Sequence, residues 1–238
     1  RWSVARLMWL FAIPEALTKI GDDHIGDIDT AEGKLFVPIE DGSKGYKNPY
    51  IGIYDSQSLN FEKYFRLPQE QQRDGVPWVA VDSTARRVYS SEYNNVTKIN
   101  AYDMDTLAPA GQIPFSPMVD SIQGAKVNDG MMYMTANAPA GTSGFALYKL
   151  NLSTGTVMQV GAFGDNLVEV EGLTFTKGAA ANPADPEINA LGVVPVNGWL
   201  GKLLHLRRVQ LSAFKRDHPS LRDEFRQRIS DKRFAGEK

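Results

Sequence analysis

Oxygen-bearing side chains lie at the start of four similar segments, and these residues are the ones best suited to chemistry. Asp27 lies in the first segment, Asp82 in the second, Gln123 in the third and Glu171 in the fourth. Ca²⁺ and Mg²⁺ prefer carboxylate and amide oxygens as ligands. If the segments converge on one axis, Asp27, Gln123 and Glu171 form an oxygen-rich site to which His24 and Asp82 add ligands. The sequence therefore predicts a Ca²⁺ or Mg²⁺ site.

A structural role is the alternative for the same residues. Asp27, Asp29 and Asp82 are placed to cap turns at strand ends, because a short carboxylate accepts hydrogen bonds from nearby backbone N–H groups. Gln123 and Glu171 would then be hydrated in a water-filled channel.

Other catalytic arrangements lack their residues. The chain has no cysteine, which excludes disulfides, cysteine-bound zinc and thiol catalysis. It has three histidines and neither a Gly-x-Ser-x-Gly elbow, a phosphate-binding loop nor a dinucleotide fingerprint.

One short pattern returns three times at a constant distance. Residues 53–59 (IYDSQSL) return as residues 101–107 (AYDMDTL) and more loosely as residues 149–155 (KLNLSTG), so that Asp55, Asp103 and Asn151 lie 48 residues apart. A period of roughly 40–50 residues with strand-like units is typical of β-propeller blades. Asp or Asn followed by Ser, Thr or Gly predicts a tight turn at each copy.

Each unit opens with an apolar segment that holds a small residue. These residues are Gly26, Ala80, Gly124 and Gly172. The innermost strands of a propeller crowd around its axis, so a small side chain lets neighbouring backbones approach.

The predicted fold is therefore all-β: a β-propeller with three recognisable four-stranded blades and the start of a fourth. Strand-length runs separated by turn signals argue against helices throughout residues 24–176. Because propellers have about four to eight blades, we expect an incomplete ring.

The repeat and its first strands resemble a known superfamily. The Tyr-Asp-x-x-Thr-Leu pattern, residues 78–82 (WVAVD) and Glu171-Gly172-Leu173 resemble the YVTN-type and regucalcin/gluconolactonase-like (NHL-like) propellers over about residues 24–176. In lactonase-like members an acidic residue of a Glu-Gly motif binds a divalent cation at the channel mouth. The resemblance carries this role to Glu171 alone, since the partner Asn and Asp are not recognisable here.

Four regions follow from these patterns: a lead-in segment over 1–23, propeller blades over 24–176, a linker or degenerate blade over 177–200, and a tail over 201–238. The tail has eleven Lys or Arg against five acidic residues, and a helix start at Ser220 predicts that it is partly helical. Apolar runs at 191–196 and 203–211 are strand-like. The lead-in run at 7–13 is read as a packing segment, with a targeting remnant as the alternative.

The sequence favours a non-catalytic binding or scaffold module with a cation on its axis. A metal-dependent hydrolase of the lactonase type is the first alternative, and a truncated fragment without activity is the second. The polar, Gly-rich loop at 41–48 offers Tyr46, Lys47 and Asn48 to a protein, glycan or small-molecule ligand. A net charge of −2 disfavours nucleic acid, and no apolar run reaches the roughly 18–20 residues of a membrane span. The compartment stays open, with an extracytoplasmic location favoured over the cytoplasm.

Overall fold

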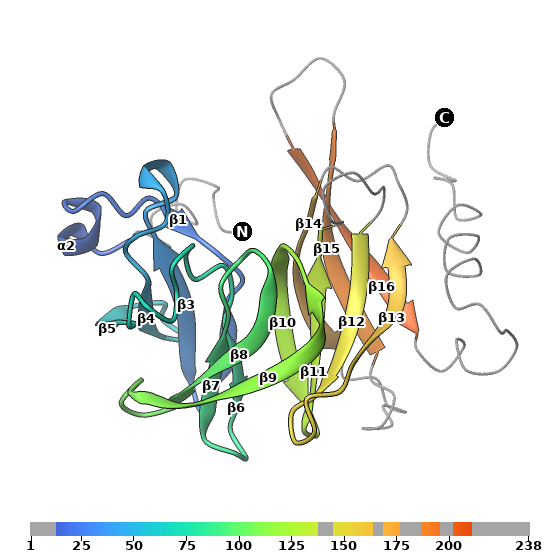
Figure 1. Ribbon diagram of the computed structural model, residues 1–238. Coiled ribbons are helices and arrows are strands. Elements are labelled where there is room, and N and C mark those ends of the chain that lie inside the picture. Colours follow the sequence, from blue (N-terminus) through green and yellow to red (C-terminus); the bar gives the residue numbers. More distant parts are fainter. Residues whose placement is uncertain (1–12, 138–144, 164–168, 177–186, 196–201, 211–238) are drawn as a thin grey trace, which may run out of the picture. The chain divides into compact units, whose positions relative to one another are not determined.

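The computed structural model describes residues 13–137, 145–163, 169–176, 187–195 and 202–210, and nearly all of the elements in these ranges are strands (Figure 1). The chain divides into two compact units, Arg1–Pro114 and Phe115–Lys238. Each unit is described by itself. Among the described residues, no helix has the length and apolarity needed to cross a membrane.

The first unit contains two antiparallel sheets. The first sheet has the order β1-β3-β4-β5, and β2 pairs with β3. The second sheet has the order β6-β7-β8-β9. The strands of the first sheet are β1 (His24–Ile25), β2 (Asp29–Ala31), β3 (Lys34–Glu40), β4 (Tyr50–Asp55) and β5 (Phe61–Arg66). Those of the second are β6 (Ala80–Asp82), β7 (Arg87–Ser90), β8 (Val96–Asp103) and β9 (Pro109–Val119), which extends past the unit boundary.

The second unit continues with a four-stranded sheet, β10-β11-β12-β13, and a three-stranded sheet, β14-β15-β16. Their strands are β10 (Ile122–Asn128), β11 (Met131–Ala136), β12 (Phe145–Asn151), β13 (Val157–Phe163), β14 (Glu169–Thr176), β15 (Glu187–Pro195) and β16 (Lys202–Gln210). Both β15 and β16 coincide with the apolar runs at 191–196 and 203–211, so the described part of the basic tail is a strand. The predicted tail helix lies outside the described residues.

Consecutive meander sheets of this kind, joined at their first strands, are the blades of a β-propeller. In the first unit Asp27 and Trp78 form a parallel bridge between the first segments of the two sheets. In the second unit β10 lies against β14. The predicted all-β fold, with three four-stranded blades and the start of a fourth, is confirmed. The incomplete ring depends on how the two units are placed and stays a prediction.

The repeated pattern forms the same turn three times, as predicted. Asp55 Oδ1 accepts hydrogen bonds from the backbone N–H groups of residues 57 and 58, and Asp103 Oδ1 does the same for residues 105 and 106. Asn151 Oδ1 accepts from residues 153 and 154. In each copy the backbone N–H four residues on also bonds to the carbonyl of the Asp or Asn, at 2.9 Å. The residues at that fourth place have left-handed backbones: Leu59 (φ 60°), Leu107 (φ 52°) and Gly155 (φ 69°).

The predicted crowding of first strands is observed at Gly26. A Cβ atom at this glycine would lie 2.0 Å from the carbonyl oxygen of Pro77, a backbone atom that cannot easily move. The backbone N–H of Asp27 donates to the same oxygen at 3.0 Å. The two blades therefore meet backbone to backbone, which only a residue without a side chain permits.

The core of the first unit has two parts, one on each face of its first sheet. Phe36 and Ile51 pack with Val79, Val88 and Tyr102 of the second sheet. The opposite face packs around the helix α2 (Glu15–Thr18), which begins after Pro14 and buries Leu17. Residues 7–12 of the lead-in lie outside the described residues.

One helical element interrupts the strands where the sequence predicts none. The 3-10 helix η1 (Gly42–Lys44) lies between β3 and β4. It forms because the carbonyl of Asp41 accepts the N–H of Lys44 at 2.9 Å and that of Tyr46 at 3.2 Å. The expectation that residues 24–176 contain no helix is corrected at this turn.

Candidate functional site

The residues of the predicted cation site are divided between the two units. His24, Asp27 and Asp82 belong to the first, and Gln123 and Glu171 belong to the second. Among the described residues, no three or more His, Asp or Glu side chains are grouped closely enough to hold a metal ion. The cation site stays a prediction.

Two of the first-unit carboxylates cap backbone groups. Asp29 Oδ2 accepts the N–H of Val81 at 2.8 Å and so links the first sheet to the second. Asp82 Oδ1 accepts the N–H of Ala85 at 2.9 Å within the turn that follows β6. These bonds agree with the alternative interpretation, in which the carboxylates stabilise strand ends.

Gln123 and Glu171 each lie at a register shift in the first strand of their sheet. The pairing of β10 with β11 shifts register between Ile122 and Gly124, which places Gln123 at a bulge. The pairing of β14 with β15 shifts between Val170 and Leu173, which places Glu171 at a bulge as well. Bulges change the direction of a side chain and are frequent beside functional sites. In β10 only Gln123 lies between the paired residues, whereas in β14 both Glu171 and Gly172 do. The shared position of Gln123 and Glu171 stays a prediction.

His24 is oriented by a buried carboxylate that the sequence did not indicate. Its Nδ1 lies 2.7 Å from Oε1 of Glu40, whose side chain is almost fully buried at the end of β3. The second oxygen of Glu40 accepts the N–H of Val76 at 2.5 Å. A strand-end Glu beside an Asp-Gly turn is usually solvated, and here the segment around Val76 approaches Glu40 and bonds to it.

The loop at 41–48 is organised around Asp41, and we call residues 41–48 the contact loop. Besides the two carbonyl bonds that form η1, Asp41 Oδ1 accepts the N–H of Asn48 at 2.9 Å. Gly45 and Tyr46 have left-handed backbones, with φ of 93° and 61°. Tyr46 is 40% exposed and lies edge-on to His24, with ring centroids 6.4 Å apart. The loop therefore holds an aromatic side chain outward on a fixed backbone.

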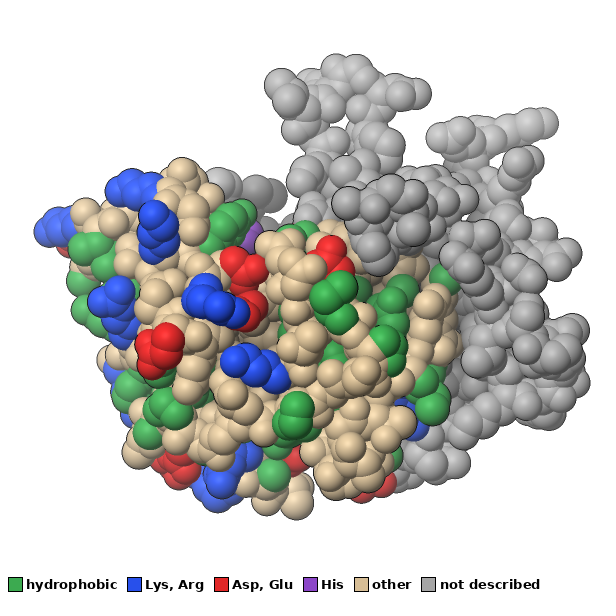
Figure 2. Space-filling model, viewed as in Figure 1, with side chains coloured by type: hydrophobic (Ala, Val, Ile, Leu, Met, Phe, Trp, Pro, Cys, Tyr) green, Lys and Arg blue, Asp and Glu red, His purple; other side chains and the backbone are tan. Residues whose placement is uncertain are grey.

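Charged and apolar side chains surround this loop. Figure 2 shows basic side chains among hydrophobic ones over the region of the first unit where Figure 1 labels α2. Lys44 and Lys47 belong to the contact loop and are exposed, and Ile20 is 46% exposed beside α2.

A second acidic residue beside the contact loop has an unusual environment. Asp22 is 1% exposed, and neither carboxylate oxygen accepts a hydrogen bond of normal geometry from the described residues. Burial raises its pKa to about 6, while the nearby amide of Asn48 acts in the opposite direction. Its neighbour Asp23 is exposed, and hydrogen bonds from the side chain and backbone of Ser43 lower its pKa.

Comparisons with known proteins find structures with a similar backbone trace but assign no family. No family model matches the chain, and no curated protein matches it. Hydrazine synthase from Kuenenia stuttgartiensis matches 80% of this chain and 63% of its own at a TM-score of 0.47 and 10% identity. The β-propeller domain of Cps50 (Swd1) from Myceliophteria thermophila matches 80% and 53%, at 0.42 and 8%. A chain of the mitotic checkpoint complex matches 84% and 67%, at 0.41 and 12%.

The chain thus spans between about half and two thirds of the length of each of these structures. The blades described above are identified from their own hydrogen-bonded sheets. The YVTN-type and regucalcin-like resemblance is not among these matches.

Proposed function

We propose that this chain is a non-catalytic β-propeller binding module that recognises a protein partner through the contact loop. The observation that carries the proposal is the exposed Tyr46, which has a φ of 61° in a loop where three backbone N–H groups donate to Asp41. Aromatic residues with left-handed backbones are uncommon and persist where the surrounding structure holds them.

The preorganised loop lowers the entropy lost when a partner binds. A rigid tyrosine contributes a large amphipathic contact area at the cost of few rotatable bonds. Its neighbours in the contact loop, Lys47 and the half-buried Asn48, add a charge and an amide at the rim. This combination of a central aromatic and a polar rim is the arrangement of a binding hot spot.

A metal-dependent hydrolase of the lactonase type is the second candidate. The bulges at Gln123 and Glu171 support it, because each residue lies at a bulge in the first strand of its sheet and bulges are frequent beside functional sites. We propose Ca²⁺ or Mg²⁺ as its cation, with Glu171 as a ligand. The resemblance to regucalcin-like propellers, which is likewise a proposal, points to the same residue.

Tyr64 provides a matched control for Tyr46, since both tyrosines belong to the first blade and both are 40% exposed. The chain would be immobilised as wild type, Tyr46→Ala and Tyr64→Ala, and proteins retained from an extract of its source cells would be quantified. We expect one partner to be lost with Tyr46→Ala and kept with Tyr64→Ala. Its affinity, measured with purified components, should fall at least about 30-fold.

Equal retention of the partner by Tyr46→Ala and Tyr64→Ala would contradict the proposal that the contact loop binds it. Calcium-dependent hydrolysis of δ-valerolactone that disappears in Glu171→Gln would favour the hydrolase instead.

A further inference from the structure

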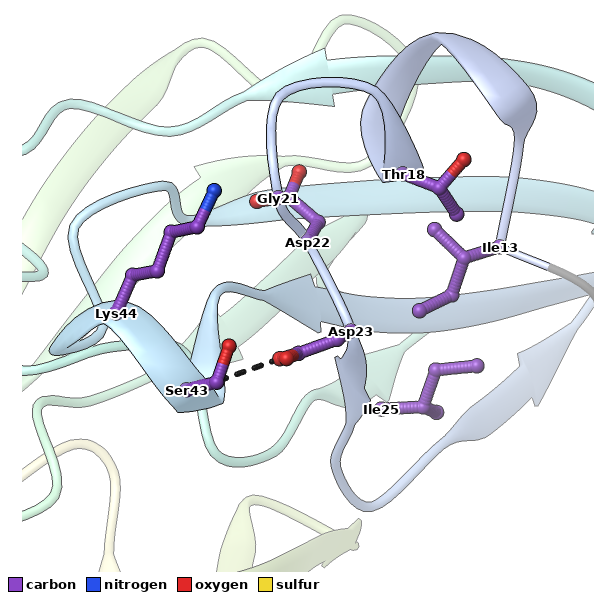
Figure 3. A pocket seen from close by; sticks show the side chains of 8 residues that line it. All are labelled: Ile13, Thr18, Gly21, Asp22, Asp23, Ile25, Ser43 and Lys44. Carbon is purple, nitrogen blue, oxygen red and sulfur yellow. Dashed lines mark hydrogen bonds between the residues drawn. The ribbon is translucent and has the colours of Figure 1, made fainter.

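A cavity of about 750 Å³ lies beside the contact loop in the first unit, between the end of α2, strand β1 and η1. Figure 3 shows Ile13, Thr18 and Ile25 on one side of it and Ser43 and Lys44 on the other. The cavity is open to solvent on one side, and its volume is comparable to that of small-molecule sites in proteins.

Asp22 supplies the reason to expect a ligand here. It lines the cavity, is 1% exposed, and its oxygens accept no hydrogen bond of normal geometry from the described residues. A buried carboxylate loses its hydration, and the nearby Asn48 amide, which lowers the Asp22 pKa, replaces only part of it. A ligand with N–H donors would therefore stabilise the ionised carboxylate of Asp22. The gain would be larger at Asp22 than at any other residue that lines the cavity.

Lys44 presents the opposite charge to the same space. Its Nζ lies over Gly21, and a Cβ atom at Gly21 would be only 2.1 Å from it. The Lys44 side chain can therefore pass close to the backbone there because Gly21 has no side chain. In Figure 3 the Lys44 ammonium and the Asp22 carboxylate point toward one another. The Lys44 side chain is long, flexible and exposed, so it can move aside to admit a ligand and then contact it.

The charge around Asp22 favours a ligand that carries an ammonium group. Asp23, Asp41 and Arg66 are the charged groups that act on Asp22 most strongly, and Lys44 lies on the far side. Three carboxylates against two cations leave an excess of one negative charge. Because no group of three metal-ligating side chains forms within the described residues, an N–H donor fits this excess better than a metal ion.

We propose that this cavity binds a small aliphatic amino acid as its zwitterion. Asp22 and Asp23 receive the ammonium group, Lys44 receives the carboxylate, and Ile13 and Ile25 contact the aliphatic side chain. The proposal concerns a site separate from Tyr46 and does not depend on the partner of the contact loop.

Isothermal titration calorimetry with L-leucine tests the site on the full chain. Two comparison compounds each lack one charged group: 3-methylbutylamine has no carboxylate, and 4-methylpentanoic acid has no ammonium. We expect leucine to bind most tightly, the amine at least about ten-fold more weakly, and the acid not at all.

Three variants separate the contributions. Asp22→Asn should weaken leucine at least about ten-fold, since it removes the buried charge with almost no change of shape. Lys44→Met should weaken leucine and leave the affinity for the amine unchanged. Tyr46→Ala should leave leucine binding intact, which separates this site from the proposed function.

The proposal is overturned if wild type binds no leucine, or if the acid binds as well as leucine. It is also overturned if Asp22→Asn and Lys44→Met both bind leucine as wild type does. Thermal midpoints of the two variants confirm that each is folded before its binding is compared.

Discussion

The buried carboxylate of Asp22 leads to a quantitative prediction about stability. Burial raises its pKa from 3.8 to about 6, so the folded state favours the protonated form. For an acid with a raised pKa, the associated stability is fully present below the unfolded pKa and is lost as the pH rises through the folded one. The ionised wild type at neutral pH therefore carries a penalty that Asp22→Asn removes.

The size of that penalty follows from the shift. A difference of about two pKa units corresponds to about 3 kcal/mol at neutral pH and falls to about 0.5 kcal/mol near pH 4. Because Asp22 is only 1% exposed, solvent screening reduces this value little. We expect Asp22→Asn to stabilise the protein by about 1–3 kcal/mol at pH 7 and to have almost no effect at pH 4.

Urea unfolding of wild type and Asp22→Asn at the two pH values measures this difference. The neighbouring Asp23→Asn is the control, because the pKa of Asp23 is lowered and its substitution should destabilise the protein at pH 7. A loss of stability in Asp22→Asn at pH 7, or a gain of equal size at both pH values, would refute the reasoning. A loss would mean that the ionised Asp22 has a partner in solution, and an equal gain at both pH values would mean that the effect does not come from its ionisation.

Substitutions at three further positions test the fold. Asp103→Ala should lower the free energy of unfolding by removing the acceptor of its turn, whereas Asp103→Asn should be tolerated because Asn151 already makes the equivalent turn; urea midpoints distinguish the two. Gly26→Ala should cost about 1–3 kcal/mol or more, since its Cβ would clash with the carbonyl of Pro77, and an unchanged thermal midpoint would contradict that close approach. Glu40→Ala should cost about 1–3 kcal/mol by leaving a buried backbone N–H without an acceptor, and Glu40→Gln should recover part of the loss in the same assay.

The repeating parts of the structure could be predicted from the sequence because they depend on local chemistry. Asp55, Asp103 and Asn151 determine their turns through hydrogen bonds to residues two to four positions away. A spacing of 48 residues makes three such turns recognisable together. Gly26 was predictable for a related reason, since its place in the repeat marks where blades approach.

The candidate site was less predictable because its key groups are defined by contacts distant in sequence. Glu40 is buried by the segment around Val76, 36 residues further on. Asp22 resembles an ordinary linker acid, and only the structure shows that it is buried without a hydrogen bond of normal geometry from the described residues. Tyr46 was identified from a polar, Gly-rich loop, but its left-handed backbone depends on how Asp41 folds that loop.

The proposed binding function is tested most directly by site-specific photo-crosslinking. A benzoylphenylalanine residue would replace Tyr46 in one sample and the equally exposed Tyr64 in another, each irradiated in an extract of the source cells. The contact-loop proposal predicts one discrete protein adduct from position 46 and none of that mass from position 64. No adduct from position 46, or the same adducts from both positions, would contradict it.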